Sequence, residues 1–155
     1  AGLVASATAG LPVDVVHTDG RGVGVHPDLP EAAFDRVLVD APCTGLGALR
    51  RRPEARWRRT PGDLEALTVL QRELLAAALR AVRPGGVVGY VTCSPHRAET
   101  AEAVATVGDE LLDAPAILAG VTGGALRLAP GPTAQLWPHR HGTDAMFLAL
   151  FRRYA

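Results

Sequence analysis

The chain has 155 residues and a mass of 16.2 kDa, so it corresponds to one domain or to part of one. Its apolar fraction of 48% allows a buried core, and its longest apolar runs are too short to span a membrane. The net charge is zero but unevenly spread: residues 50–59 hold six arginines and one glutamate, whereas the rest of the chain holds 10 arginines and 15 acidic residues. Two cysteines are too few for a disulfide scaffold and indicate a reducing compartment, here the cytoplasm.

The hydrophobic pattern predicts strands and helices that alternate along the chain. In chain order these are a helix over residues 3–10, strands over 13–17 and 34–40, a long helix over 61–82, a strand over 86–92, a helix over 97–112, and strands over 126–128 and 145–151. The long helix is the best delimited, because Thr60 is a suitable N-cap and Asp63 can complete a capping box. This succession predicts an α/β fold with a largely parallel sheet.

Polar residues follow three of the predicted strands, at the edge where such sheets bind ligands. Asp19 follows the first strand, Asp40 and Cys43 follow the second, and Cys93 follows the third. The two cysteines are therefore predicted to lie on one rim, close together and without a disulfide. Cys93 also precedes a predicted helix, whose N-terminus would favour the reactive thiolate.

The residues alone leave several interpretations of the cysteine pair open. Both side chains are small and can simply fill space. A redox pair lacks the Cys-x-x-Cys spacing, a zinc site with His139 and His141 has unsuitable spacing, and a cysteine hydrolase would depend on His96 alone. No metal site is predicted. The basic segment 50–59 indicates contact with a polyanion, and its alternative is a solvated loop balanced by acidic neighbours.

Two long motifs resemble those of a known enzyme family. DAPCTGLGALRRRPEARW (residues 40–57) and GYVTCSPHRAET (residues 89–100) are similar to motifs of the Nol/Nop/Sun family of RNA 5-methylcytosine methyltransferases. The bacterial 16S rRNA enzymes of the Sun/Fmu type have the most similar pattern, and residues 135–153 resemble the closing hairpin of the family. The sequence departs from the family pattern at Thr44, where serine is usual, and at Thr100, where asparagine is common.

This resemblance implies a Rossmann-like fold, S-adenosylmethionine as the cofactor, and methyl transfer to C5 of cytosine in RNA, with rRNA as the expected substrate and tRNA as the alternative. It implies that Cys93 is the nucleophile that adds to C6 of the base and that Cys43 assists release of the product. Asp40 is implied to supply the acid at N3. Asp19 and Asp40 are implied to contact the cofactor, and Pro42 to fix the loop beside the RNA.

The resemblance also gives the basic segment a role. Arg50, Arg51, Arg52 and Arg56 closely follow the Cys43 loop, so they are predicted to contact phosphates beside the target base. Trp57 is expected to pack against the protein rather than to stack on a base. The alternative function is a non-catalytic RNA-binding module that uses this segment and has inert cysteines. No membrane contact is predicted.

A glycine-rich sequence at residues 20–24 is expected to be a loop after the third methyltransferase strand rather than the cofactor loop, because no helix follows it. The cofactor loop and the first two strands are then absent, so residues 1–155 are expected to be the C-terminal portion of a single catalytic domain. Two predictions follow from this incompleteness. These residues alone bind negligible S-adenosylmethionine, and an open apolar edge at residues 36–40 is covered by a second copy of the chain or by the N-terminal segment.

Overall fold

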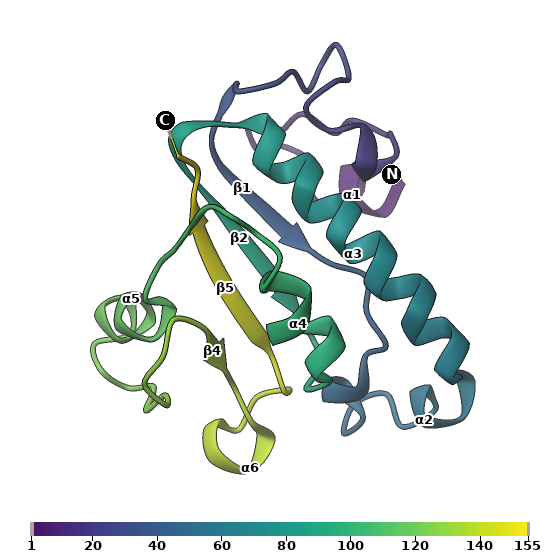
Figure 1. Cartoon of the computed structure of the whole chain (residues 1–155). Coiled ribbons are helices and arrows are strands. Elements are labelled where there is room, and N and C mark those ends of the chain that lie inside the picture. The colour runs from purple at the N-terminus through teal and green to yellow at the C-terminus, as the bar shows by residue number, and fades with distance from the viewer. Residues whose placement is uncertain (1, 155) are drawn as a thin grey trace.

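A computed structural model describes residues 2–154, in which one long helix packs along a small β-sheet (Figure 1). The α-helices are α1 (Gly2–Ala7), α2 (Ala55–Arg58), α3 (Pro61–Ala81), α4 (Ala101–Val104), α5 (Ala114–Val121) and α6 (Pro138–His141). The strands are β1 (Phe34–Asp40), β2 (Val82–Thr92), β3 (Glu110–Leu111), β4 (Ala134–Gln135) and β5 (Phe147–Arg152). Three 3₁₀ helices are η1 (Gly20–Gly22), η2 (Leu46–Ala48) and η3 (Arg97–Glu99). The α/β class predicted from the sequence is confirmed.

The strands form one sheet in the order β1-β2-β5-β3, with β4 paired to β5. At its core β1 and β2 are parallel, with Val37 opposite Val88 and Asp40 opposite Val91. Strand β5 runs antiparallel to β2, and the short strands β3 and β4 run antiparallel to β5. Because β1 and β2 point the same way, the loops that follow them leave the sheet at the same rim.

Helix α3 has the boundaries that its first residues predict. The Thr60 hydroxyl accepts a hydrogen bond from the Asp63 amide at 3.3 Å, and the Asp63 carboxylate accepts one from the Thr60 amide at 2.7 Å. These two bonds satisfy amides that the first helical turn leaves without partners. The helix buries Leu75 and Ala78 against the sheet, where the core also contains Val82, Val88, Tyr90, Ala103, Val104, Phe147, Ala149 and Phe151.

Several other predicted elements are absent or shorter than expected. Residues 13–17 form no strand, and Val13 and Val15 are exposed because no neighbouring strand lies beside them in the described chain. Residues 126–128 also form no strand. The helix expected over 97–112 is limited to η3 and α4, since the chain turns before Gly108 and continues into β3.

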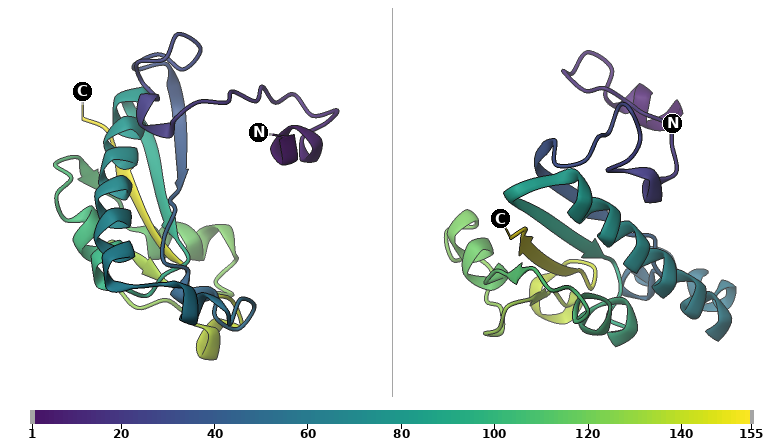
Figure 2. Two further views of the ribbon diagram at one scale, coloured as in Figure 1. Left: turned by 90° about the vertical axis from the view of Figure 1, so that its right-hand side faces the viewer. Right: turned by 45° about the horizontal axis from the view of Figure 1, so that its top comes forward.

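The outer edge of β1 is open. Leu38 in the middle of this strand is 71% exposed, and between residues 2 and 154 only β2 pairs with β1. Figure 2 shows that the N-terminal residues extend away from the sheet. The expectation that the N-terminal segment covers this edge is therefore wrong, because that segment forms no strand; coverage by a second copy of the chain stays a prediction. No helix within the described residues is both long and apolar enough to cross a membrane.

Candidate active site

The loops that follow β1 and β2 bring Cys43 and Cys93 together. Their sulfur atoms lie 3.3 Å apart, and both cysteines are free. The two loops are joined by backbone hydrogen bonds, because the Ala41 amide donates to the Val91 carbonyl at 2.9 Å and the Gly47 amide donates to the Cys93 carbonyl at 3.0 Å. The prediction that the sulfurs share one rim without a disulfide is confirmed.

Close approach of the backbone explains the glycine at position 47. A Cβ atom there would lie 2.8 Å from the Cys93 carbonyl oxygen and would collide with the Ala145 carbonyl oxygen. The Ala145 amide in turn donates to the Gly47 carbonyl at 3.0 Å. The Cys43 loop is thereby held both to the Cys93 turn and to the segment that leads into β5.

The two thiols differ in burial and in proton affinity. Cys43 is buried, and its pKa is raised above the ordinary cysteine value by the hydrogen bond to Cys93 and by burial. The same hydrogen bond lowers the pKa of the more exposed Cys93 to about 6. These opposite directions favour Cys43 as the neutral thiol that donates and Cys93 as the thiolate that accepts. The predicted cause of this activation was wrong, because the helix after Cys93 is only the three-residue η3, which begins at Arg97.

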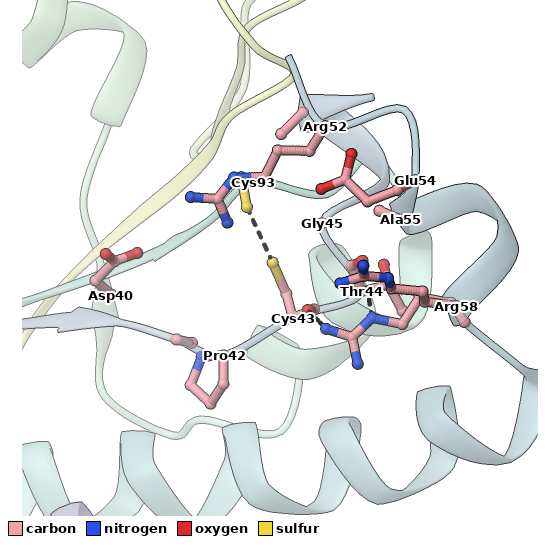
Figure 3. A pocket seen from close by; sticks show the side chains of 13 residues that line it. Asp40, Pro42, Cys43, Thr44, Gly45, Arg52, Glu54, Ala55, Arg58 and Cys93 are labelled. Atoms are coloured by element: carbon pink, nitrogen blue, oxygen red, sulfur yellow. Dashed lines mark hydrogen bonds between the residues drawn. The ribbon is translucent and has the colours of Figure 1, made fainter. Parts of the chain in front are cut away.

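The cysteine pair opens into a pocket of about 500 Å³ (Figure 3). Its walls are formed by Asp40, Ala41, Pro42, Cys43, Thr44, Gly45, Ala48, Arg52, Glu54, Ala55, Arg58, Arg59 and Cys93. Figure 3 shows Asp40 on one side of the two sulfurs and Glu54 and Arg58 on the other. A pocket of this size with a thiolate and several cations is large enough for a nucleobase and its flanking phosphates.

Outside the basic segment, two of the other predicted site residues line this pocket and one does not. Asp40 and Pro42 are in its wall, and the Pro42 carbonyl accepts a hydrogen bond from Gln71 Nε2 at 2.9 Å. Asp19 lies outside the wall and accepts hydrogen bonds from Arg21 Nε at 3.0 Å and Nη2 at 2.5 Å, which lower the pKa of Asp19 to about 2. The roles of these three residues toward a cofactor or a base stay predictions.

Asp40 also borders a second, smaller hollow. This hollow of about 220 Å³ runs along the open side of β1 and is lined by Gly20, Val23, Val37, Leu38, Val39, Asp40, Leu74 and Ala78. It is predominantly apolar and lies beside the glycine-rich residues 20–24. Asp40 thus stands where the apolar hollow and the cysteine pocket meet.

The predicted RNA-binding arginines have different surroundings. Arg51 forms an ion pair with the buried Asp144 carboxylate, which lowers the pKa of Asp144. Arg50 Nη2 donates to the Gly142 carbonyl at 3.1 Å, so both residues connect the basic segment to the turn before β5. Arg52 lines the cysteine pocket.

The rest of the basic segment contributes to the same surface. Arg56 is exposed on α2, and Arg58 lines the pocket. Arg59 donates to the carbonyl oxygens of Thr44 at 3.2 Å and Cys43 at 3.4 Å, a contact that its place in the sequence did not predict. Trp57 on α2 is 83% exposed, so the expectation that it packs against the protein is wrong.

His96 and His141, two of the histidines considered as site residues, have local hydrogen-bond partners. Nδ1 of His141 accepts the Trp137 amide at 2.9 Å, and Nδ1 of His96 accepts the Ala98 amide at 3.2 Å. Within residues 2–154 no group of three histidine, cysteine, aspartate or glutamate side chains is arranged to hold a metal ion. Within the described residues, His139 and His141 are therefore not part of a group that could hold zinc.

The fold is shared with solved structures, among them a methyltransferase homolog protein from Pyrococcus horikoshii, with a TM-score of 0.72 and 25% sequence identity over 98% of this chain and 48% of that chain. NSun6 from Pyrococcus horikoshii, solved with SFG, superimposes with a TM-score of 0.63 and 28% sequence identity over 92% of this chain and 35% of that chain. The protein therefore has the Rossmann-like fold of S-adenosylmethionine-dependent methyltransferases, as the sequence predicted.

The family model for the 16S rRNA methyltransferase RsmB/F matches residues 1–152, and the chain belongs to this family. Rv1407 of Mycobacterium tuberculosis is 60% identical over 99% of this chain and 33% of its own length. Ribosomal RNA small subunit methyltransferase B of Sodalis glossinidius is 39% identical over 81% of this chain and 29% of its own length. The chain thus spans about a third of the length of these relatives.

Proposed function

We propose that this chain supplies the cysteine-bearing part of an enzyme that transfers a methyl group from S-adenosylmethionine to C5 of a cytosine in RNA, with rRNA as the substrate. The observation that carries the proposal is the contact of 3.3 Å between Cys43 and Cys93 at the rim of the sheet. Membership of the RsmB/F family supports rRNA over tRNA. Because the chain spans about a third of its relatives, the activity is proposed for the complete gene product.

The first chemical step uses the Cys93 thiolate. C5 of cytosine is a poor nucleophile, and addition of sulfur to C6 converts the ring to an enamine whose electron pair is available at C5. N3 of the base takes up a proton in this step, and Asp40 in the pocket wall is proposed to supply it. A pKa near 6 leaves Cys93 mostly ionised at neutral pH, which favours this addition.

The release step uses Cys43. S-adenosylmethionine, when bound, would supply the methyl group to C5. Water then accepts the C5 proton, the N3 proton returns to Asp40, the C5–C6 double bond re-forms and the C6–S bond breaks. The electron pair of that bond returns to the Cys93 sulfur. The neutral Cys43 thiol can donate a hydrogen bond to this departing sulfur, because the two sulfur atoms already lie 3.3 Å apart and the pKa of Cys43 is raised above the ordinary cysteine value.

The basic segment is proposed to hold the RNA backbone. Arg52 and Arg56 have open guanidinium groups beside or near the pocket, where phosphates next to the target base would lie. Arg50 and Arg51 are proposed to act from the same surface while they also anchor the segment to the turn before β5. Pro42 fixes the shape of the loop between Asp40 and Cys43.

The cofactor is proposed to reach the pocket from the apolar hollow along β1. That hollow is of suitable chemistry for part of an adenosyl group and adjoins the cysteine pocket at Asp40, while Asp19 lies near its end at Gly20. Its volume of about 220 Å³ is below the range of about 300–1,000 Å³ of complete small-molecule sites. Residues 1–155 alone are therefore proposed to bind S-adenosylmethionine negligibly, although NSun6 with SFG, an analogue of this cofactor, supports its use by the family.

Two further parts of the proposal concern self-association through the outer edge of β1 and location in the cell. An unpaired strand with an exposed leucine tends to associate with other strands, so isolated copies of this chain are proposed to pair through β1. Free, close thiols and an RNA substrate are consistent with work in the cytoplasm.

Methylation of unmodified rRNA by the complete gene product tests this function against the alternative of a non-catalytic RNA-binding module. We expect 5-methylcytosine in the product, detected by mass spectrometry of nucleosides, and none with Cys93→Ala. RNA binding that persists without methyl transfer by the unmodified protein, on both rRNA and tRNA, would favour the binding module.

A further inference from the structure

The structure points to Glu99 as a positioning residue for the cysteine pair. We propose that the buried Glu99 carboxylate clamps the Cys43 loop to the Cys93 turn and thereby sets the separation and relative burial of the two sulfurs. This inference rests on the proposed function, in which both sulfurs serve one base. Glu99 itself touches neither sulfur, so its effect passes through the residues that follow each cysteine.

The clamp is built from four hydrogen bonds to a side chain with no exposed surface. Glu99 Oε1 accepts the Thr44 backbone amide at 2.7 Å and Gln71 Nε2 at 3.1 Å. Glu99 Oε2 accepts the Thr44 hydroxyl at 2.5 Å and the Ser94 hydroxyl at 2.6 Å. Thr44 directly follows Cys43, and Ser94 directly follows Cys93. One carboxylate therefore binds the chain on the C-terminal side of both cysteines.

The surrounding contacts keep this carboxylate in place. Gln71 of α3 also donates to the Pro42 carbonyl at 2.9 Å, which connects the clamp to the other side of Cys43. Tyr90 of β2 donates its hydroxyl to the Glu99 backbone carbonyl at 3.0 Å. Helix α3, strand β2 and both loops thus meet at Glu99.

Removal of this side chain would leave buried donors without partners. An unsatisfied buried donor is strongly unfavourable, so the two loops would move toward water or toward new acceptors. A shift of either loop changes the separation of 3.3 Å between the two sulfur atoms and so weakens the hydrogen bond between the cysteines. The Cys93 thiol is then expected to return toward the ordinary cysteine pKa of about 8.5.

The two carboxylate oxygens have different kinds of donor, and this predicts which substitution is tolerated. Oε1 faces only N–H groups, whereas Oε2 faces only hydroxyls, which can accept as well as donate. A glutamine with its oxygen at the Oε1 position and its amide nitrogen at the Oε2 position can keep all four bonds. Glu99→Gln should therefore retain the clamp, while Glu99→Ala should lose it.

The test is the pH profile of Cys93 alkylation by iodoacetamide in the complete gene product, followed by mass spectrometry of the Cys93 peptide. The unmodified protein and Glu99→Gln should show midpoints near 6, and Glu99→Ala should show a midpoint moved toward about 8.5. Glu102→Ala is the matched control, because Glu102 is exposed on α4 and its carboxylate forms an ion pair with Arg97 at the surface. Circular dichroism establishes that each variant is folded.

If Glu99→Ala fails to fold, the double variant Thr44→Val with Ser94→Ala tests the same clamp by removal of its two hydroxyl donors, and a smaller upward movement of the midpoint is expected. A folded Glu99→Ala or double variant with the midpoint of the unmodified protein would overturn the proposal, as would a Glu99→Gln variant that behaves like Glu99→Ala. These measurements need no RNA, so absence of methyl transfer by the unmodified protein would overturn the proposed function without affecting this result.

Discussion

The rim that carries the cysteines and the outer edge of β1 are adjacent in the molecule. They differ in whether their polar groups have hydrogen-bond partners within the chain. At the rim, the buried carboxylates of Glu99 and Asp144 bind donors from three loops, and two thiols share a hydrogen bond. At the edge, no strand within residues 2–154 pairs with the outer side of β1, and Leu38 is 71% exposed.

This difference shows which half of the proposed site the chain builds by itself. The hydrogen bonds that join the two cysteine loops lie among residues 41–145, so these loops are held together within this chain. The cofactor side is a hollow of about 220 Å³ beside an open strand, compared with about 500 Å³ for the cysteine pocket. Changes at the rim should therefore have large effects on chemistry, and changes at the edge should have small effects on stability.

The largest effect is expected from loss of the nucleophile. Cys93→Ala removes the sulfur that adds to C6, so methyl transfer to rRNA by the complete gene product should fall by several orders of magnitude while RNA binding is retained. Incorporation of labelled methyl groups measures the first, and a filter-binding assay measures the second. Residual transfer above a tenth of the unmodified rate would show that Cys93 is not the nucleophile.

A change in the core beneath the rim should have the largest effect on stability. Leu75 is 2% exposed in α3, and Leu75→Ala should lower the free energy of unfolding by about 2–5 kcal/mol through lost burial and the cavity left behind. Urea denaturation followed by circular dichroism gives the value. A loss below about 1 kcal/mol would mean that α3 is not packed on the sheet as described.

The acid side of the pH profile should follow the lowered pKa of Cys93. The thiolate predominates above about pH 6 and is protonated as the pH falls, so alkylation of Cys93 should slow about tenfold between pH 7 and pH 5. Cys43→Ala removes the donated hydrogen bond and should raise the midpoint toward about 8.5. A midpoint that stays near 6 in that variant would assign the activation to another group.

The smallest effect on stability is expected at the edge. Leu38→Lys places a charge where the side chain is already in water, so the free energy of unfolding should change by less than about 0.5 kcal/mol. The same charge should weaken pairing between isolated chains, which sedimentation velocity can measure. Unchanged self-association in this variant would show that copies meet elsewhere, and a strictly monomeric parent chain would remove the proposed pairing altogether.

The elements that the sequence predicted well are those with local signals. The capping box at Thr60 and Asp63 fixed the start of α3, and an apolar run ended by Pro42 marked β1. The short elements β3, β4 and α6 were missed because a segment of two to four residues is too short to show a repeat of apolar residues. Residues 13–17 were predicted to be a strand because valine favours the extended conformation. A strand also needs a neighbouring strand to pair with, and residues 13–17 have none in the described chain.

The site was predictable to a similar degree and for a similar reason. Asp40 ends β1, Pro42 and Cys43 follow it, and Cys93 follows β2. Parallel strands bring such residues to one rim. Glu99 was missed because its partners are brought to it only by the fold. Its position within the motif at residues 89–100 was the one available signal, and nothing in the local pattern distinguishes a buried glutamate from a solvated one.

The central claim is that the two cysteines act in sequence on one base, and trapping of the covalent adduct tests it most directly. Cys43→Ala in the complete gene product, incubated with rRNA and S-adenosylmethionine and analysed on a denaturing gel, should accumulate a protein–RNA adduct, because addition by Cys93 continues while release stalls. The double variant with Cys93→Ala should form none. A Cys43→Ala protein that migrates free of RNA while it still methylates would contradict the assigned roles.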